Sequence, residues 1–330
     1  MQIEQYLKRY QPIIYKTFTN AIENKHLSHA YLLSGSSGMP LKEVALFLAK
    51  SILCDNPSPL ACDNCVTCLR INDGNYPDVM IFDGANTKIK KGDIEKIMNN
   101  FDKTSLEDKG IMIYILNLVE TMTPVAVNSL LKFLEEPGKN IYAFLTTENE
   151  SKVLPTILSR TQILRFRSVP KNEILIDASN EGVNQEDAEM LCSFYSDGKS
   201  IKDMSESDLY KTVKVALDEQ LDALLRSSDE AIYVCERRII PQIKSNDTAR
   251  LYIKLLGIVF QDLLNKQVNG NIILTTYDNI LNELLTRLKH IDRSLFIIMS
   301  SISKLDLNVN IPLLLDHIIY EITKEDGNGK

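Results

Sequence analysis

The order of apolar runs and helical patterns along the chain constrains its fold more than any other feature. In the first half, short apolar runs alternate with segments whose apolar residues recur at helical spacing. This alternation is typical of a parallel sheet whose strands are joined by crossover helices, so we predict an α/β domain. The predicted strands are residues 30–34, 79–82, 111–116, 142–147 and 163–166.

The second half reads differently, because strand signals stop after Phe166. Val169-Pro170 and the charged residues that follow predict a hinge. A small helical unit is expected over residues 167–206 and a helical bundle over residues 207–330. The stripe formed by Leu255, Leu256, Val259 and Leu263 predicts a helix whose apolar face lies in the bundle core.

Composition narrows the functional classes. The net charge of −7 argues against a chain that grips DNA phosphates by itself, because such binding depends on an excess of Lys and Arg. Work on nucleic acid is therefore expected to be shared with partners. The amino terminus lacks the pattern of a signal peptide, and no apolar stretch approaches the roughly 18 residues that span a bilayer, so a cytoplasmic protein without membrane contact is expected.

A degraded nucleotide loop follows the first predicted strand. A working P-loop needs glycine amides around the phosphates, a lysine for their oxygens and a hydroxyl for magnesium. The loop here begins at Gly35 and keeps Gly38. Pro40 stands at the position of the last P-loop glycine, and Leu41 at the position of the lysine. Lys42 stands where the residue with the magnesium-binding hydroxyl is expected. No bound ATP is expected, although Lys42 as a displaced phosphate lysine is the alternative, one residue out of register.

The end of the third predicted strand agrees with this loss. ATPases of this architecture place acidic residues there, which hold magnesium and polarise water. The chain has Asn117 and Glu120 at these places, so the leading carboxylate is absent.

Four cysteines predict a metal site. Cys54, Cys62, Cys65 and Cys68 form C-x7-C-x2-C-x2-C in a turn-rich segment. Four thiolates complete a tetrahedral zinc with no open position, so a structural Zn²⁺ is predicted in an insert at residues 54–68. An iron–sulfur cluster and free thiols are the alternatives. The segment has little basic excess, which favours a folding clip or docking surface over a nucleic-acid-binding ribbon.

Several motifs together resemble the delta-prime family of the bacterial DNA polymerase III clamp loader, an AAA+ family. They are Ser28-His-Ala-Tyr31, the four-cysteine insert, Asn75-Tyr-Pro-Asp78, Asn128-Ser-Leu-Leu-Lys-Phe-Leu-Glu-Glu-Pro137, Thr146-Thr-Glu-Asn149 and Leu154-Pro-Thr-Ile-Leu-Ser-Arg160. The resemblance implies an AAA+ core (residues 1–166), a small helical lid (167–206) and an all-helical collar (207–330). Motor subunits of the family keep an intact P-loop, so the degraded loop favours delta-prime.

The resemblance also implies a site residue. In the family a Ser-Arg-Cys motif presents its arginine to ATP on a neighbouring motor subunit, and Ser159-Arg160-Thr161 occupies that position. Thr161 departs from the pattern. The plain alternative for Arg160 is a surface arginine beside Arg165 and Arg167.

Three further residues match family positions less specifically. Thr147 and Asn149 fall in the sensor region, where they can also be hydrogen-bonding turn residues. Lys202 aligns weakly with a basic residue of active lids.

The resemblance implies a subunit without ATPase activity of its own, acting within the polymerase holoenzyme. Its expected partners are motor ATPase subunits and a delta subunit in a five-membered ring, the sliding clamp, and primed DNA through the complex. Two alternatives stay open from the residues: an active motor ATPase of the same group, and a zinc-ribbon nucleic-acid-binding protein.

Overall fold

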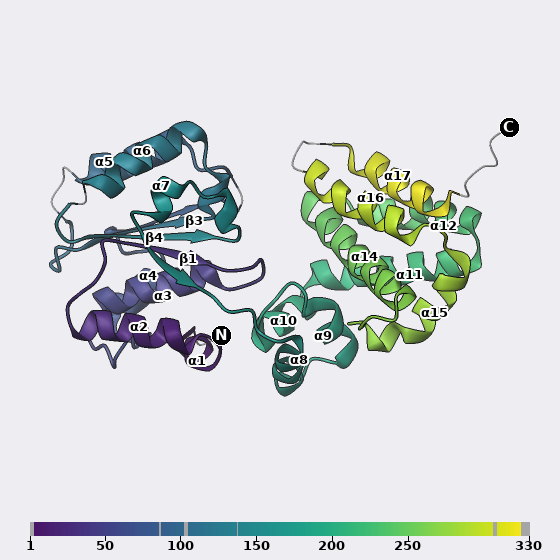
Figure 1. Ribbon diagram of the computed structural model, residues 1–330, viewed down its shortest axis with the longest axis horizontal. Coiled ribbons are helices and arrows are strands. Elements are labelled where there is room, and N and C mark those ends of the chain that lie inside the picture. Colours follow the sequence, from purple (N-terminus) through teal and green to yellow (C-terminus); the bar gives the residue numbers. More distant parts are fainter. Residues whose placement is uncertain (1–2, 86, 102–104, 137, 306–308, 325–330) are drawn as a thin grey trace. The chain divides into compact units, whose positions relative to one another are not determined.

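The computed structural model describes residues 3–85, 87–101, 105–136, 138–305 and 309–324. The chain divides into two compact units, Met1–Pro170 and Lys171–Lys330, and Figure 1 shows the elements of each. A further division of the second unit at residue 206 stays a prediction. None of the described helices is long and apolar enough to cross a membrane.

A five-stranded sheet, parallel throughout, forms the centre of the first unit. The strands are β1 (Ala30–Ser34), β2 (Val79–Asp83), β3 (Met112–Asn117), β4 (Ile141–Thr147) and β5 (Gln162–Arg165). Their order across the sheet is β2-β3-β4-β1-β5, which places β1 between β4 and β5. All five predicted strands are confirmed with small shifts at their ends, because buried parallel strands read as apolar runs bounded by turns.

Helices cover both faces of this sheet, as Figure 1 shows. On β1, Tyr31 and Leu33 pack into the core cluster of the first helices and α3, whereas Ala30 and Leu32 pack into the cluster that contains residues of α5 and α6. The helical elements of this unit are α1 (Ile3–Tyr10), α2 (Pro12–Glu23), α3 (Leu41–Leu53), α4 (Val66–Asn72), α5 (Lys91–Phe101), η1 (Val119–Thr121), α6 (Pro124–Glu135), η2 (Glu150–Lys152) and α7 (Pro155–Leu158).

Helix α6 begins as its sequence predicts. The Thr123 hydroxyl accepts from the Ala126 amide, and Pro124 stands in the first turn, where a missing N–H has no cost. The helix ends at Glu135, with Glu136 as its cap residue. Pro137, the proline of the predicted stop, lies outside the described residues.

The second unit is helical throughout its described part. Its elements are α8 (Lys171–Asn180), α9 (Gln185–Leu191), α10 (Gly198–Ser205), α11 (Asp208–Arg226), α12 (Ser228–Val234), η3 (Cys235–Ile239), α13 (Ile240–Gln242), α14 (Asn246–Gln267), η4 (Thr275–Tyr277), α15 (Asp278–Arg287), α16 (Ile291–Lys304) and α17 (Ile311–Thr323). Helix α14 packs against α11, α15 and α16. The predicted stripe at residues 255–263 is confirmed as core, because its four apolar side chains are fully buried.

A polar cluster joins α9 to α11 and η4. The Lys214 ammonium lies between the carboxylates of Glu186 and Asp218, and the Tyr277 hydroxyl contacts both carboxylates at 2.8 Å and 2.7 Å. The hydrogen bond from Lys214 holds the pKa of Glu186 below its usual value. Because these groups come from three elements, their mutual contacts fix α9 onto the bundle.

Gly198 allows α10 to approach α8 closely. A Cβ at this position would lie 2.4 Å from the Asp177 carbonyl carbon and 2.6 Å from the Ala178 nitrogen, both backbone atoms that cannot rotate away. The Gly198 amide also donates to the Asp177 carboxylate at 2.7 Å. Only a residue without a side chain fits this contact.

We therefore expect Gly198→Ala to lower the free energy of unfolding by about 1–3 kcal/mol, since overpacking forces backbone shifts. Urea unfolding of the full chain followed by circular dichroism measures this. Gly92→Ala in α5 is the control, because no described atom lies within 4 Å of the added Cβ. That variant should change stability by less than about 1 kcal/mol. Equal midpoints for both variants would contradict the assigned α8–α10 packing.

Candidate functional site

The degraded loop and two other predicted site segments lie at one edge of the sheet. Since all strands are parallel, the loop after β1 meets the carboxyl ends of β3 and β4 there, which is where α/β sheets bind ligands. The Gly35 amide donates to the Thr147 carbonyl at 3.1 Å and ties the loop to β4. The sequence-predicted residues of this region therefore come together.

Apolar side chains fill the inside of the loop. A Cβ on Gly35 would lie 2.8 Å from the Met39 sulfur and 3.1 Å from a methyl carbon of Leu41, so both side chains rest on the glycine. Leu41 is buried in the core cluster beneath α3. Two further loop amides are used internally, because Met39 donates to Ser36 and Leu41 donates to Met39. The loop thus closes on itself where a P-loop would surround phosphates.

Lys42 turns to a carboxylate of its own chain. Its ammonium contacts Asp83 Oδ2, at the end of β2, at 2.5 Å. Asn117 donates to the other oxygen of Asp83 at 2.7 Å and accepts from the Thr146 hydroxyl at 2.6 Å. Burial raises the pKa of Asp83, but the hydrogen bonds from Lys42 and Asn117 outweigh burial and leave that pKa below its usual value. Lys42 is therefore neutralised by an ionised Asp83.

The remaining predicted residues of this edge make turn contacts. Glu120 accepts from the Glu148 amide at 2.8 Å. The Thr147 hydroxyl accepts from the Asn149 amide, and the Asn149 side chain accepts from the Ser151 amide, both at 3.1 Å. These are the turn bonds that the plain interpretation of Thr147 and Asn149 predicts. Lys202 lies on α10 in the second unit.

Arg160 follows the short helix α7, which begins at Pro155. Its guanidinium donates to the Thr156 carbonyl at 3.1 Å, the Ser159 hydroxyl at 3.2 Å and the Glu135 carboxylate at 2.8 Å. The side chain is 34% exposed, so part of the guanidinium faces solvent. A partly exposed, oriented guanidinium can bind an anion presented from outside the chain.

The neighbouring arginines have other contacts. Arg165 makes two parallel hydrogen bonds to the Glu150 carboxylate at 3.0 Å and 2.7 Å. The Arg167 backbone is tied to the Gln11 side chain, whose amide donates at 2.8 Å and whose oxygen accepts at 2.9 Å. Arg160 therefore differs from Arg165 in its partners: it donates three hydrogen bonds to three different groups, whereas Arg165 donates two to a single carboxylate.

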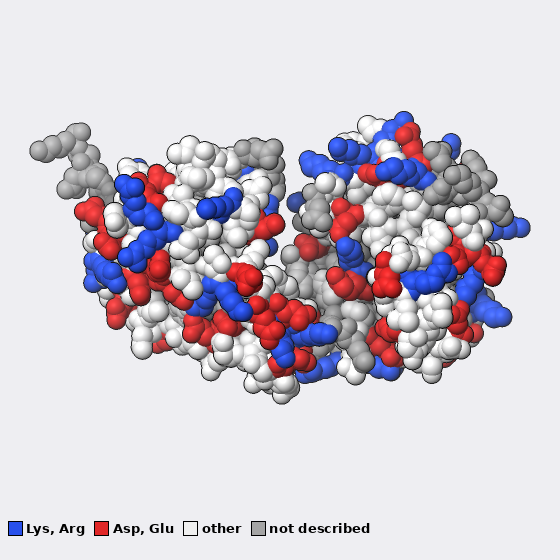
Figure 2. All heavy atoms as spheres, turned by 180° about the vertical axis from the view of Figure 1, so that it is seen from behind, with Lys and Arg blue, Asp and Glu red and all other residues white. Residues whose placement is uncertain are grey.

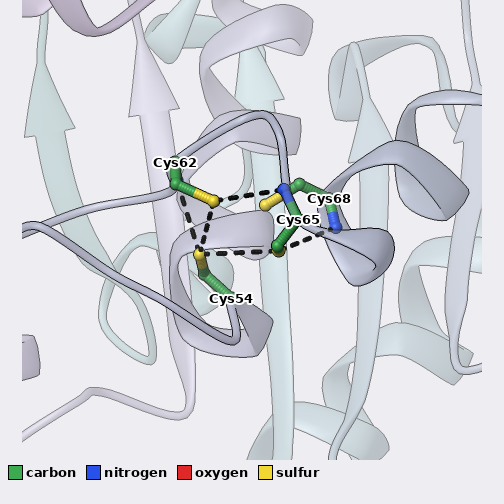
Figure 3. Close-up of side chains that lie close together, drawn as sticks. All are labelled: Cys54, Cys62, Cys65 and Cys68. Carbon is green, nitrogen blue, oxygen red and sulfur yellow. Dashed lines mark hydrogen bonds between the residues drawn. The ribbon is translucent and has the colours of Figure 1, made fainter.

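The four clustered cysteines point their sulfurs at one another (Figure 3). All four sulfurs lie within 4.8 Å of one another, with Cys54 at 3.5 Å from Cys62 and 3.9 Å from Cys65. Sulfurs placed tetrahedrally about 2.3 Å from a zinc ion are separated by about 3.8 Å. The residues fit a tetrahedral metal ion, and none of the four cysteines is engaged in a disulfide.

Backbone amides line this sulfur cluster. The Cys62 amide donates to Cys54, the Cys65 amide to Cys62 and the Cys68 amide to Cys65, at 3.3–3.4 Å between nitrogen and sulfur. Backbone hydrogen bonding, chiefly from Asn64, lowers the pKa of the Cys62 thiol to about 7. Burial raises the pKa of Cys68. Amide donors of this kind stabilise thiolate sulfur, which is the form that binds metal.

Charged side chains that no sequence motif indicates fasten the insert. The Lys50 ammonium, on α3 and buried, contacts Asp63 and donates to the Asn72 side chain at 2.8 Å. Lys109 donates to Asp55 at 2.6 Å and holds the pKa of that carboxyl at about 2. Each lysine is distant in sequence from the aspartate that it contacts, so hydrophobic periodicity does not indicate these pairs.

Asp78 organises a second attachment of the insert, through the loop at residues 105–107. Its buried carboxylate accepts from the Ser105 hydroxyl and from the amides of Leu106 and Glu107 at 2.5–3.1 Å. Glu107, in turn, accepts two hydrogen bonds from Arg70 of α4 at 2.9 Å and 2.7 Å. The motif Asn75-Tyr-Pro-Asp78 was the sequence signal for this attachment, because its aspartate caps the loop at residues 105–107 and links that loop to the insert.

Comparison with known proteins shows which family the chain resembles. A family model described as "DNA polymerase III, delta subunit" matches residues 10–170. The chain is 29% identical to DNA polymerase III subunit delta' of Bacillus subtilis (strain 168), over 94% of this chain and 95% of that protein. Both matches show that the chain is similar to DNA polymerase III clamp-loader subunits. Within that family it resembles delta' along nearly the whole length of both chains.

The chain is also similar to other clamp-loader subunits, in sequence and in fold. The gamma subunit of Buchnera aphidicola subsp. Baizongia pistaciae (strain Bp) is 29% identical over 85% of this chain and 74% of that protein. The solved structure of a DNA polymerase III gamma subunit-related protein from Thermotoga maritima covers 94% of this chain and 99% of that one, with a TM-score of 0.52 and 20% identity. The predicted AAA+ fold class is confirmed.

The capping role of Asp78 gives a direct prediction. Asp78→Ala removes the acceptor of two backbone amides, and each unsatisfied donor is costly, so the free energy of unfolding should fall by about 1–3 kcal/mol. Urea unfolding measures the change, with the exposed Asp73→Asn as control. If Asp78→Ala matched that control, the capping assignment would be wrong.

Proposed function

We propose that this clamp-loader subunit neither binds nor hydrolyses ATP and that it presents Arg160 to a nucleotide held by a neighbouring motor subunit. The observation that carries the proposal is the buried Leu41 at the place of the phosphate lysine. A leucine in the core cannot neutralise phosphate charge, and the neighbouring Lys42 is neutralised by Asp83. Asn117 at the end of β3 stands where ATPases of this architecture place their leading carboxylate, so a second component of the ATPase site is missing.

The geometry of Arg160 supports the other half of the proposal. A guanidinium placed against a γ-phosphate stabilises the charge that builds up in the transition state. Ser159 accepts from the guanidinium and donates to the Thr156 carbonyl at 3.1 Å, so it serves as an orienting residue beside the arginine. Thr161, which replaces the cysteine of the family motif, donates to the Ile157 carbonyl at 3.0 Å and closes the turn behind Arg160.

The partners belong to the same proposal. They are motor ATPase subunits and a delta subunit in a five-membered ring, which loads a sliding clamp onto primed DNA. Residues 1–166 would form the AAA+ core, residues 167–206 the lid and residues 207–330 the collar that holds the ring together. On the face shown in Figure 2, Lys and Arg side chains are interspersed with Asp and Glu, which supports DNA contact through the whole complex rather than through this chain alone.

The cysteine insert has a structural role in this proposal. Cys54, Cys62, Cys65 and Cys68 would hold one Zn²⁺ with all four positions filled by protein, which leaves no position for substrate. The ion would clip the end of α3 to the start of α4. The acidic side chains Asp55 and Asp63 on the insert are engaged with lysines of the same unit, which disfavours a nucleic-acid-binding ribbon.

Arg160→Ala in a reconstituted clamp loader tests whether Arg160 acts as an arginine finger, that is, a guanidinium that one subunit presents to ATP on its neighbour. Assembly should be unchanged, because Arg160 contacts only an exposed carboxylate and local groups among the described residues. DNA-stimulated ATP turnover should fall at least about twofold, since a finger contributes on the order of 10³ at the site it serves while other sites stay intact. Arg165→Ala is the matched control. Unchanged turnover in an assembled Arg160→Ala complex would refute the finger.

Elemental analysis tests the zinc. The purified chain should contain about one zinc per molecule, and Cys68→Ser should lose it, because a site with three thiolates binds zinc more weakly. Cys192→Ser, a buried thiol in the second unit, should keep the metal. Iron in place of zinc, or no metal after gentle purification, would contradict this assignment.

A further inference from the structure

The guanidinium of Arg160 is oriented by two helices at once. Nη1 donates to the Thr156 carbonyl and the Ser159 hydroxyl, both from α7 and its end, whereas Nη2 donates to Glu135 Oε1 at 2.8 Å. Glu135 is the last residue of α6. The contact to Glu135 is thus the one that ties the arginine to a second, longer helix.

Glu135 stands where a helix disfavours an acid. The carboxyl end of a helix carries partial negative charge, which repels a carboxylate and attracts a cation. Glu136 follows directly as the cap residue and adds a second negative charge. The Arg160 guanidinium places a positive charge against Glu135 at this end. A locally unfavourable residue that is compensated by a site residue indicates a role at the site.

The contact with Glu135 orients Arg160 and leaves some N–H groups of its guanidinium available. Arg165 spends two nitrogens on both oxygens of Glu150. Arg160 gives Glu135 one nitrogen only, although it donates three hydrogen bonds in all, one more than Arg165. A guanidinium has five N–H groups, and three of those of Arg160 are used in these hydrogen bonds, so others stay available for phosphate oxygens. The Glu135 side chain is 52% exposed, and exposed pairs are weak and screened by salt.

We infer that Glu135 is a positioning residue for Arg160: it holds the guanidinium in one orientation on the surface, ready for a phosphate of the neighbouring subunit. This inference rests on the proposed finger role of Arg160. Glu135 touches neither nucleotide nor magnesium in this account and acts only through the arginine. Glu136 supplies the comparison, since among the described residues no ion pair or hydrogen bond involves its carboxylate.

A double-mutant cycle in the reconstituted complex tests the inference. Glu135→Gln should lower kcat for DNA-stimulated ATP turnover by less than Arg160→Ala does, because losing one exposed ion pair slows only the site that Arg160 serves, by about two- to fivefold, and it should leave KM for ATP unchanged. Glu136→Gln is the matched control and should leave kcat unchanged. In the Arg160→Ala background, Glu135→Gln should have no further effect, because the group through which it acts is gone.

The cycle separates two kinds of failure. If Arg160→Ala itself leaves turnover unchanged, the finger role is wrong and this inference falls with it. If Arg160→Ala lowers turnover but Glu135→Gln behaves like wild type, or if the two effects multiply independently, the finger stands and the positioning role of Glu135 is wrong. Gel filtration of each complex confirms that all variants are assembled.

Discussion

The burial of Leu41 is the constraint on which the candidate site depends. A leucine in the core contributes roughly 1.5–3 kcal/mol relative to an exposed one, so the first turn of α3 is anchored inward. With this turn fixed, Met39 and Leu41 cover Gly35, the loop amides bond to nearby carbonyls, and Lys42 reaches Asp83. The edge of the sheet that would bind a ligand is filled by the protein itself.

Helix α3 is fixed at both ends, which links the loop to the cysteine insert. At its start, Lys42 pairs with Asp83 on β2, and at its end Cys54 joins the sulfur cluster. The insert is then held by Lys109 and by the loop that Asp78 caps. Few of these elements can move independently, which suits a subunit proposed to act as a rigid member of a ring and to present Arg160 at a fixed place.

Much of the fold could be predicted from the sequence, whereas the polar contacts could not. Strands and the start of α6 follow from apolar runs and from Thr123-Pro124, which are local signals. The cysteine spacing likewise predicted a cluster that the structure brings together. The pairing of Lys42 with Asp83 and of Arg160 with Glu135 joins residues distant in sequence, and one sequence holds no local signal for such partners. From the sequence, Lys42 could be placed only at the position of the P-loop hydroxyl or as a displaced phosphate lysine.

The central claim is that the loop after β1 cannot hold a nucleotide. Equilibrium dialysis of the full chain, purified alone, against Mg-ATP tests it most directly. The account predicts no saturable binding over the range in which enzymes usually bind substrates, about 1 µM to 1 mM. Saturable binding of about one ATP per chain in that range would contradict it, because phosphates would then have to displace the contacts of Leu41 and Lys42.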